Sequence, residues 1–247
     1  MKDNFSNQAN FYAQFRPDYP TELYDFILQN VDNQGVAWDC ATGNGQAAKV
    51  LAGHFETVYA TDISQKQLDN AVKADNIVYS ISPAESTHFE DNTFDLITVA
   101  QAVHWFDFDT FYAEVKRVAK PNATIAIWGY GNLKFDEKEL DGRMWDFYSH
   151  RVGKYWNFER RHVEEEYRSL PFPFQEIESP RFSMVRKWQR DEFEGYLNSW
   201  SAVQNCKNTE GVNPVTEFML DLSAVWGEFE RKLLRFPLFL KLGKVVK

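Results

Sequence analysis

A glycine-containing turn follows the first run of apolar residues. Residues 36–45 read VAWDCATGNG, so Gly43 and Gly45 stand in the turn before a helix that we expect to begin near Gln46. Glycines in such a turn let the backbone approach a ligand closely, and the N–H groups at the helix start favour an anionic group. With Ala48, the glycines also match the dinucleotide-binding pattern G-x-G-x-x-A. The turn alone leaves open a pyrophosphate or the carboxylate of an amino-acid moiety.

A carboxylate follows the second apolar run at the distance expected for a ribose ligand. Asp62 lies seventeen residues beyond Gly45, near the interval of roughly twenty residues at which an acid accepts both ribose hydroxyls in nucleotide-binding folds. In the alternative interpretation the glycines form an ordinary turn, and Asp62 only stabilises the start of the next helix through the helix dipole. The pairing of turn and acid favours a nucleotide-like ligand.

A second acid distinguishes between the candidate ligands. Asp39 precedes Gly43 by four residues and ends the first apolar run. Its carboxylate would repel a pyrophosphate but attract a cation, and S-adenosylmethionine carries both an ammonium and a sulfonium group. We therefore predict S-adenosylmethionine as the cofactor. An NAD(P)-dependent oxidoreductase is the alternative that uses the same glycines, and a non-catalytic protein that binds a cofactor or a partner is the third hypothesis.

Candidates for contact with a methyl acceptor carry imidazole and indole groups. His104 follows the fourth apolar run, at the sheet edge where open α/β folds bind ligands, and is predicted to act as a base or to orient the acceptor. Its alternative role is that of a neutral, hydrogen-bonded core histidine. Trp105, Trp128 and Trp200 are predicted to form walls of the acceptor site, with core packing as the alternative. A base is needed for a hydroxyl or a protonated amine but not for a carboxylate.

Short apolar runs alternate with helical segments over the first half of the chain. The runs are Val36 to Trp38, Thr57 to Ala60, Ile77 to Tyr79, Phe94 to Val99 and Ala123 to Trp128. This alternation predicts a parallel sheet with the ligand at the carboxyl ends of its strands. Ser64 and Gln67 have the spacing of a capping box, and Pro121 is expected to end the helix that carries Phe111.

The alternation weakens after Tyr130, where a long polar helical region rich in aromatic residues precedes two strand-like segments. We expect an α/β fold with a doubly wound, Rossmann-like, mostly parallel sheet, a C-terminal antiparallel strand and a helical, aromatic-rich cap. The chain is expected to form one domain. Its parts are an N-terminal cap segment over 1–35, a cofactor-binding core over 36–131, a substrate-side elaboration over 132–235 and a closing strand over 236–247.

Charge and composition restrict the partners. A net charge of −9 should repel polyphosphates, so a nucleic-acid substrate is unlikely on this basis. Cys40 and Cys206 lack the spacing of a metal or redox site, and we expect reduced, buried thiols and no metal. Neither a signal-peptide pattern nor a stretch of eighteen apolar residues is found, which predicts a cytoplasmic protein without a membrane span. The sequence gives no indication of an oligomeric state.

Several segments together resemble the class I S-adenosylmethionine-dependent methyltransferases, in particular a small-molecule branch similar to trans-aconitate methyltransferases. Besides the glycine turn, they are FRPDYP at 15–20, AES at 84–86, NTFDLITVAQAVHWF at 92–106 and LNSWSAV at 197–203. The resemblance covers most of the chain and implies methyl transfer to a small molecule, with a carboxylate or a hydroxyl as the accepting group. The N-P-P-[YFW] type of signature of enzymes that methylate base or amide nitrogen is absent after residue 99.

The resemblance also implies cofactor contacts. The matching positions are Asp39, Ala41, Gly43 and Gly45 for the methionine moiety, Asp62 for ribose, Ile63, Ala84 and Glu85 for the adenine side, Gln101 for the inner side of the donor, and Tyr12, Arg16 and Tyr19 for an N-terminal segment that folds over the cofactor. Arg16 has alternatives as a clamp for an acceptor carboxylate or as a surface residue. Two positions depart from the family pattern. Ala41 replaces the first glycine, a change expected to be mild, and Pro83 stands where an aspartate often binds the adenine amino group.

Overall fold

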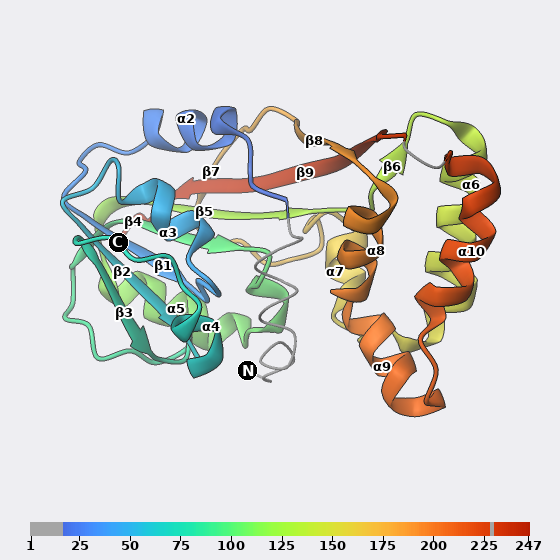
Figure 1. The fold of residues 1–247 in the computed structure, drawn as a ribbon. Helices are drawn as coiled ribbons and strands as arrows, with labels where there is room; N and C mark the ends of the chain where they lie inside the picture. The colour runs from blue at the N-terminus through green and yellow to red at the C-terminus, as the bar shows by residue number, and fades with distance from the viewer. Residues whose placement is uncertain (1–16, 228–229) are drawn as a thin grey trace.

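The computed structural model describes residues 17–227 and 230–247, and its centre is a parallel sheet (Figure 1). The five parallel strands are β1 (Val36–Cys40), β2 (Thr57–Asp62), β3 (Ile77–Ile81), β4 (Phe94–Ala100) and β5 (Ala119–Tyr130). They lie in the order β3-β2-β1-β4-β5, and each neighbouring pair is parallel. Each predicted apolar run lies inside one of these strands, which confirms the doubly wound parallel sheet.

Helices cover both faces of this sheet. Their bounds are α2 (Thr21–Gln29), α3 (Gln46–Leu51), α4 (Gln65–Asp69), the 3₁₀ turn η2 (Val103–Trp105) and α5 (Phe108–Val118). Leu23 of α2 and Leu51 of α3 belong to the apolar cluster on one face, whereas Phe111 and Val115 of α5 belong to the cluster on the other. Because side chains alternate along a strand, β1 directs Trp38 toward α5 and Asp39 toward α3.

A long C-terminal strand closes the sheet. β9 (Lys232–Lys244) pairs antiparallel with β5 and also with β6 (Lys134–Phe135), β7 (Gln175–Ile177) and β8 (Phe182–Trp188). The antiparallel closing strand is confirmed, but its predicted start at residue 236 was too late. Pro237 lies in a gap between two pairings on one side of β9: the pairing with β5 stops at Leu238, and the pairing with β6 starts at Arg235. Proline is tolerated there because no hydrogen bond of those two pairings needs its missing N–H.

The entry into β5 differs from the expectation for Pro121. The preceding helix ends at Val118, and the strand begins at Ala119, before the proline. Pro121 then lies in a bulge, because the pairing with β4 shifts between Phe94 and Leu96, and Asn122 adopts a φ of 63°. The proline therefore bends the strand and does not end the helix.

The remaining helices form a cap beside the N-terminal start of β9, on the right in Figure 1. They are α6 (Lys138–Asp146), the π-helical turn η3 (Phe147–Arg151), the 3₁₀ turn η4 (Gly153–Tyr155), α7 (Arg160–Glu164), α8 (Arg190–Asn198), α9 (Ser201–Glu210) and α10 (Pro214–Trp226). The long helical region expected after residue 132 is thus broken into short pieces. Directly after η4, the Trp156 indole N–H donates a hydrogen bond to the backbone carbonyl of Tyr148, a contact that sequence periodicity does not encode.

Aromatic rings join the cap to the sheet. Phe236 of β9 lies 5.4 Å from Tyr196 of α8, Tyr196 lies 5.7 Å from Trp200, and Trp200 lies 6.3 Å from Phe147 of η3, all between ring centroids. These side chains belong to the same buried cluster as the α2 and α3 contacts. The cap is therefore packed continuously with the apolar core that covers one face of the sheet. Within residues 17–227 and 230–247, no helix is long and apolar enough to cross a membrane.

Candidate functional site

The loops that follow the parallel strands meet at one edge of the sheet. Because β1, β2, β3 and β4 run in the same direction, their carboxyl ends lie together. This edge carries predicted cofactor residues in four groups: 39–45 at the end of β1 and after it, Asp62 and Ile63 at the end of β2, Ala84 and Glu85 after β3, and Gln101 after β4. His104, the predicted base or acceptor-orienting residue, also follows β4. The described part of the chain has no cluster of three or more acidic, histidine or cysteine side chains that could hold a metal ion.

The loop between β1 and α3 contains three residues in the left-handed backbone region. The φ angles are 53° for Ala41, 57° for Gly43 and 82° for Gly45. Ala41 is therefore strained, because an L-residue with a side chain adopts this conformation at a cost. The replacement of glycine by alanine, expected to be mild, therefore carries a backbone cost at this position. Gly45 has an additional reason to be glycine, since a Cβ there would collide with the Tyr79 hydroxyl.

Asp39 is buried beneath this loop and holds it together. Its side chain is only 1% exposed. Oδ1 accepts a hydrogen bond from the Thr98 hydroxyl at 2.7 Å, and Oδ2 accepts from the Thr42 hydroxyl at 2.5 Å and from the Ala48 N–H at 3.1 Å. One carboxylate thus joins β1, β4, the loop and the first turn of α3.

Burial raises the pKa of Asp39 to about 6, while the hydrogen bonds from Thr42, Thr98 and Ala48 oppose this rise. The negative charge of Asp62 raises the pKa further. Two carboxylates therefore face the same loop. A cation bound there would favour their ionised forms, whereas a pyrophosphate would add to the repulsion.

Asp62 connects the ends of β1 and β2. Its Oδ2 accepts from the Gly43 N–H at 2.9 Å, and its Oδ1 accepts from the Ser64 N–H at 2.9 Å. Each carboxylate oxygen can accept more than one hydrogen bond, so these contacts leave capacity for ribose hydroxyls. The donor and acceptor set of the loop is compatible with the amino-acid and ribose parts of S-adenosylmethionine.

The residues after β3 and β4 occupy different environments. Ala84 is buried against the α5 face, Pro83 is exposed and Ile63 is partly exposed. Glu85 accepts from the Asp107 N–H at 3.3 Å. Gln101 has a φ of 54°, and its amide group exchanges two hydrogen bonds with the backbone of Tyr130. Gln101 therefore extends the pairing of β4 with β5, and cofactor binding by its side chain stays a prediction.

Two of the predicted residues on the N-terminal segment, Tyr12 and Arg16, lie outside the described residues. Tyr19 is described, and its ring lies 5.5 Å from that of Trp128 in an edge contact. Trp128 is fully buried between Tyr19 and Tyr24, and within the described chain its indole N–H has no hydrogen-bond partner. This environment is that of a core residue, and a role of Trp128 in acceptor binding stays a prediction.

His104 is 7% exposed and lies in the turn η2. Its Nδ1 is 2.8 Å from the Tyr167 hydroxyl, and its ring lies 4.9 Å from that of Trp105. Burial lowers the pKa of His104 to about 3, and the positive charge of Arg160 acts in the same direction. A neutral imidazole with so low a pKa is a weak proton acceptor at neutral pH, which disfavours base catalysis by His104, and its role in orienting the acceptor stays a prediction.

Tyr167, whose hydroxyl contacts His104, lies in a segment with a strained backbone. Glu166 and Tyr167 are consecutive residues with φ values of 54° and 57°, and the Tyr167 side chain is fully buried. Its ring also packs on Phe239 of β9 at 4.8 Å. Backbone strain of this kind persists only where the surrounding structure fixes it. The segment after α7 is thus held in place to present a hydroxyl to His104.

A cavity of about 920 Å³ opens beyond the end of β5, between the sheet and the cap. Its walls include the aromatic side chains of Trp145, Tyr148, Trp156 and Trp200. A role of Trp200 in acceptor binding stays a prediction. Arg160 also lines the cavity. The guanidinium group lies 4.7 Å from the Trp156 ring, with Nε donating to the Tyr148 hydroxyl and Nη2 donating to the side-chain oxygen Oδ1 of Asn132.

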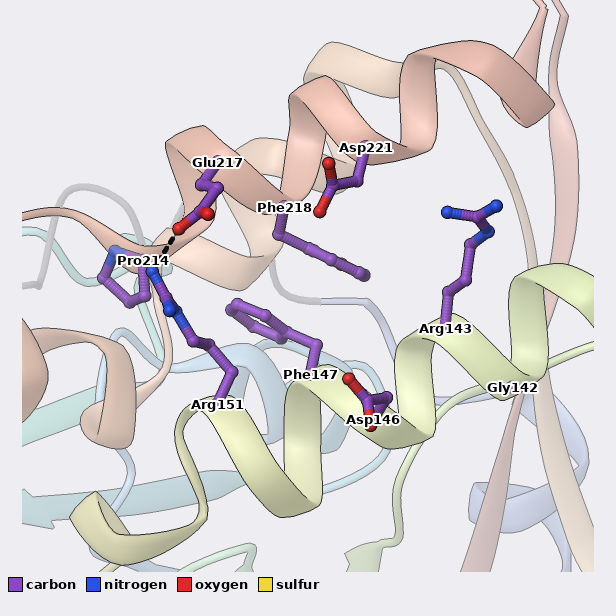
Figure 2. Close-up of a pocket in the computed structure, with 9 residues that line it drawn as sticks. All are labelled: Gly142, Arg143, Asp146, Phe147, Arg151, Pro214, Glu217, Phe218 and Asp221. Atoms are coloured by element: carbon purple, nitrogen blue, oxygen red, sulfur yellow. Dashed lines mark hydrogen bonds and ion pairs between the residues drawn. The ribbon is translucent and has the colours of Figure 1, made fainter.

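A second, smaller cavity of about 400 Å³ lies on the far side of the π-helical turn. Figure 2 shows it between α6 and η3 on one side and α10 on the other. Phe147 and Phe218 stack 4.2 Å apart, and Arg151 forms an ion pair with Glu217 across the groove. None of the predicted site residues lines this smaller cavity. The contacts drawn there hold two cap helices together.

Sequence reasoning missed several residues of the site. Thr42 and Thr98 bind Asp39, Tyr167 binds His104, and Arg160 lines the larger cavity. The threonines were detectable in principle, because a buried acid requires donors and both lie near predicted strand ends. Tyr167 and Arg160 carried no signal, since they come from the cap and meet the sheet edge only through the tertiary fold.

Comparison with known proteins gives one consistent result. A family described as a methyltransferase domain matches residues 38–127. A Dictyostelium discoideum protein with a provisional methyltransferase name is 32% identical and covers 98% of this chain and 95% of its own length. A solved structure from Anaeromyxobacter dehalogenans, provisionally named a type II methyltransferase, is 37% identical with a TM-score of 0.86 and covers 94% of this chain and 99% of its own. A Bacillus halodurans structure shares the fold, with 17% identity and a TM-score of 0.54. The match covers 92% of this chain and 100% of that structure's chain.

We predict that Ala41→Gly stabilises the protein. Ala41 has a φ of 53°, and glycine should relieve this strain and raise the free energy of unfolding by about 1 kcal/mol. Ala52→Gly is the control, because Ala52 has a φ of −60° and its replacement should cost about 0.5 to 1 kcal/mol. Urea unfolding of both variants measures the difference. A loss of stability in Ala41→Gly would contradict the left-handed assignment.

We also predict that His104 makes stability depend on pH. Its pKa falls from 6.5 to about 3 on folding, so the unfolded chain binds more protons between these values, and stability declines as pH falls from about 6.5 toward 3. The decline approaches about 1.4 kcal/mol per pH unit in that range. His104→Asn should remove this contribution and flatten the curve. Urea unfolding from pH 7 to 5 tests it, with the exposed His54→Asn as control. Equal slopes in wild type and His104→Asn would show that His104 titrates normally.

Proposed function

This chain belongs to the class I S-adenosylmethionine-dependent methyltransferases, and from that premise we propose that it methylates a small molecule held in the aromatic cavity beside Trp200. The observation that carries the cofactor part is the pair of carboxylates, Asp39 and Asp62, at the same loop. Their charge suits a sulfonium and an ammonium group and opposes a dinucleotide pyrophosphate. The NAD(P)-dependent alternative shares the glycines but not this charge pattern.

The larger cavity is the proposed acceptor site. It follows β5 directly, since Gly131 and Asn132 line it. Arg160, which also lines it, acts electrostatically on His104. Four cationic and three acidic side chains line it, whereas the whole chain has a net charge of −9. The cavity thus offers apolar walls and a locally less negative field, which suits an acceptor with an anionic group.

Arg160 is the proposed anchor for that group. Nε and Nη2 are engaged by Tyr148 and Asn132, which fixes the guanidinium plane, and Nη1 has no hydrogen-bond partner among the described residues. Arginine held in this way can bind a carboxylate with little loss of side-chain freedom. Among the acceptors considered, a carboxylate is favoured over a hydroxyl because His104 is a weak base and a carboxylate needs none.

The proposed mechanism relies on positioning. When bound, S-adenosylmethionine supplies a methyl group on a positively charged sulfur. The chain's own residues hold the acceptor oxygen about 3 Å from that carbon and exclude water with aromatic walls. His104 and Tyr167 keep the edge of β4 in place without moving a proton. We further propose that 132–235 forms the acceptor side of a single domain, since its buried side chains join the core of the sheet.

The cofactor assignment predicts selective binding. S-adenosylhomocysteine should bind in calorimetric titration and NADH should not. Asp62→Ala should weaken the binding by about 1.5 to 3 kcal/mol, because it removes a charged hydrogen-bond acceptor. Asp69→Ala, at an exposed acid of α4 that bonds Gln65, is the matched control and should change little. Binding of NADH alone would overturn the proposal.

The acceptor assignment predicts a selective effect of Arg160. With labelled S-adenosylmethionine and a panel of carboxylic acids, Arg160→Met should raise KM for active acids by about 10-fold or more, which corresponds to one lost charged hydrogen bond. Arg168→Met is the control, because Arg168 is exposed and does not line the cavity. Affinity for S-adenosylhomocysteine should stay unchanged in both variants. Equal KM values would exclude Arg160 as the anchor.

A further inference from the structure

The first turn of α4 departs from the capping box that its sequence predicts. In a capping box, the Gln67 side chain would accept a hydrogen bond from the Ser64 N–H. Here the Ser64 N–H donates to Asp62 Oδ1 instead, at 2.9 Å. The other half of the box is present, since the Ser64 hydroxyl accepts from the Gln67 N–H at 3.4 Å. Asp62 thus accepts the hydrogen bond from the Ser64 N–H that the Gln67 side chain would accept in a capping box.

The displaced side chain of Gln67 is buried and incompletely bonded. Gln67 is 4% exposed, and within the described residues its carbonyl oxygen Oε1 has no hydrogen-bond partner. Leaving a buried acceptor unsatisfied costs on the order of 1 to 3 kcal/mol, so such atoms are rare and require an explanation. Helix α4 could not satisfy Oε1 by itself, because Asp62 has taken the nearest N–H group.

The position of Oε1 connects it to the cofactor loop. A Cβ built on Gly43 would have Gln67 Oε1 as its nearest neighbour, at 4.0 Å. The N–H of Gly43 donates to Asp62 Oδ2, so Asp62 and Gln67 approach the same residue of the loop. One acid and one neutral acceptor therefore approach the loop residue beside which the ribose is proposed to bind.

We propose that Gln67 is a second cofactor-contacting residue, whose Oε1 accepts a hydrogen bond from a ribose hydroxyl of the bound cofactor. The inference rests on the proposed cofactor. A ribose diol offers two O–H donors, and Asp62 shares its oxygens with two backbone N–H groups. A second acceptor beside it completes the recognition of the diol. The buried oxygen is thereby satisfied in the complex and unsatisfied without it.

This role has a consequence that a structural role does not share. If Gln67 served the fold, its replacement by an apolar residue would destabilise the protein. If Oε1 awaits a ligand, the same replacement removes a buried unsatisfied atom, so the ligand-free protein should be equally or more stable while cofactor affinity falls. Methionine is the suitable substitute, because it is unbranched and adapts to the same space.

The test compares Gln67→Met with Gln65→Met, a matched change at the exposed glutamine two residues earlier in α4. S-adenosylhomocysteine affinity is measured by calorimetry, and urea unfolding is measured without ligand. We expect Gln67→Met to raise the Kd about 10-fold, as for one lost hydrogen bond, with an unfolding midpoint equal to or above that of wild type. Gln65→Met should leave the Kd unchanged.

Adenosine and 2′,3′-dideoxyadenosine serve as competitors that locate the contact at the ribose. Wild type should prefer adenosine, and Gln67→Met should reduce that preference. Unchanged affinity in Gln67→Met, or lowered stability or failure to fold, overturns the inference while leaving the proposed function intact. If wild type fails to bind S-adenosylhomocysteine, the proposed function itself is overturned.

Discussion

The buried carboxylate of Asp39 is the constraint on which the geometry of the site depends. A charge out of contact with water is tolerated only when hydrogen bonds surround it, and Asp39 obtains them from β4, from the loop and from the first turn of α3. Each donor must therefore keep its place relative to β1. This requirement fixes the path of the chain between strand and helix, and the left-handed conformations of Ala41, Gly43 and Gly45 follow from it.

The rest of the sheet edge is built outward from that loop. Asp62 binds the Gly43 N–H and the Ser64 N–H, and so transmits the position of the loop to the start of α4. On the other side, Gln101 continues the pairing of β4 with β5, and His104 is held by Tyr167. The acids lie toward α3 and α4, and the neutral imidazole lies toward the cap. The edge thus separates a region with two acids, suited to cations, from a region beside Arg160.

The cap obtains its position from aromatic packing. Phe236, Tyr196, Trp200 and Phe147 form a continuous series of ring contacts from β9 into the cap helices. The π-helical turn η3 places neighbouring residues on opposite sides, with Phe147 in the smaller cavity and Tyr148 in the larger one. A wide turn of this kind is frequent at functional sites. The same segment therefore packs the cap and shapes the cavity that faces the sheet.

The sequence by itself determined the parallel sheet, the glycine loop and the acids after β1 and β2, because strand periodicity and loop chemistry are local properties. It also placed His104 at the correct edge, since the end of a parallel strand defines that edge. Only the tertiary structure decided which polar groups form hydrogen bonds with one another. The capping box of Ser64 and Gln67 was half wrong because Asp62 competes for the Ser64 N–H, and the low pKa of His104 follows from burial beside Tyr167 and Arg160. The larger cavity also depends on the tertiary structure. Side chains from separate elements of 132–200 converge on it, and the spacing of these residues along the chain does not encode how close they lie in space.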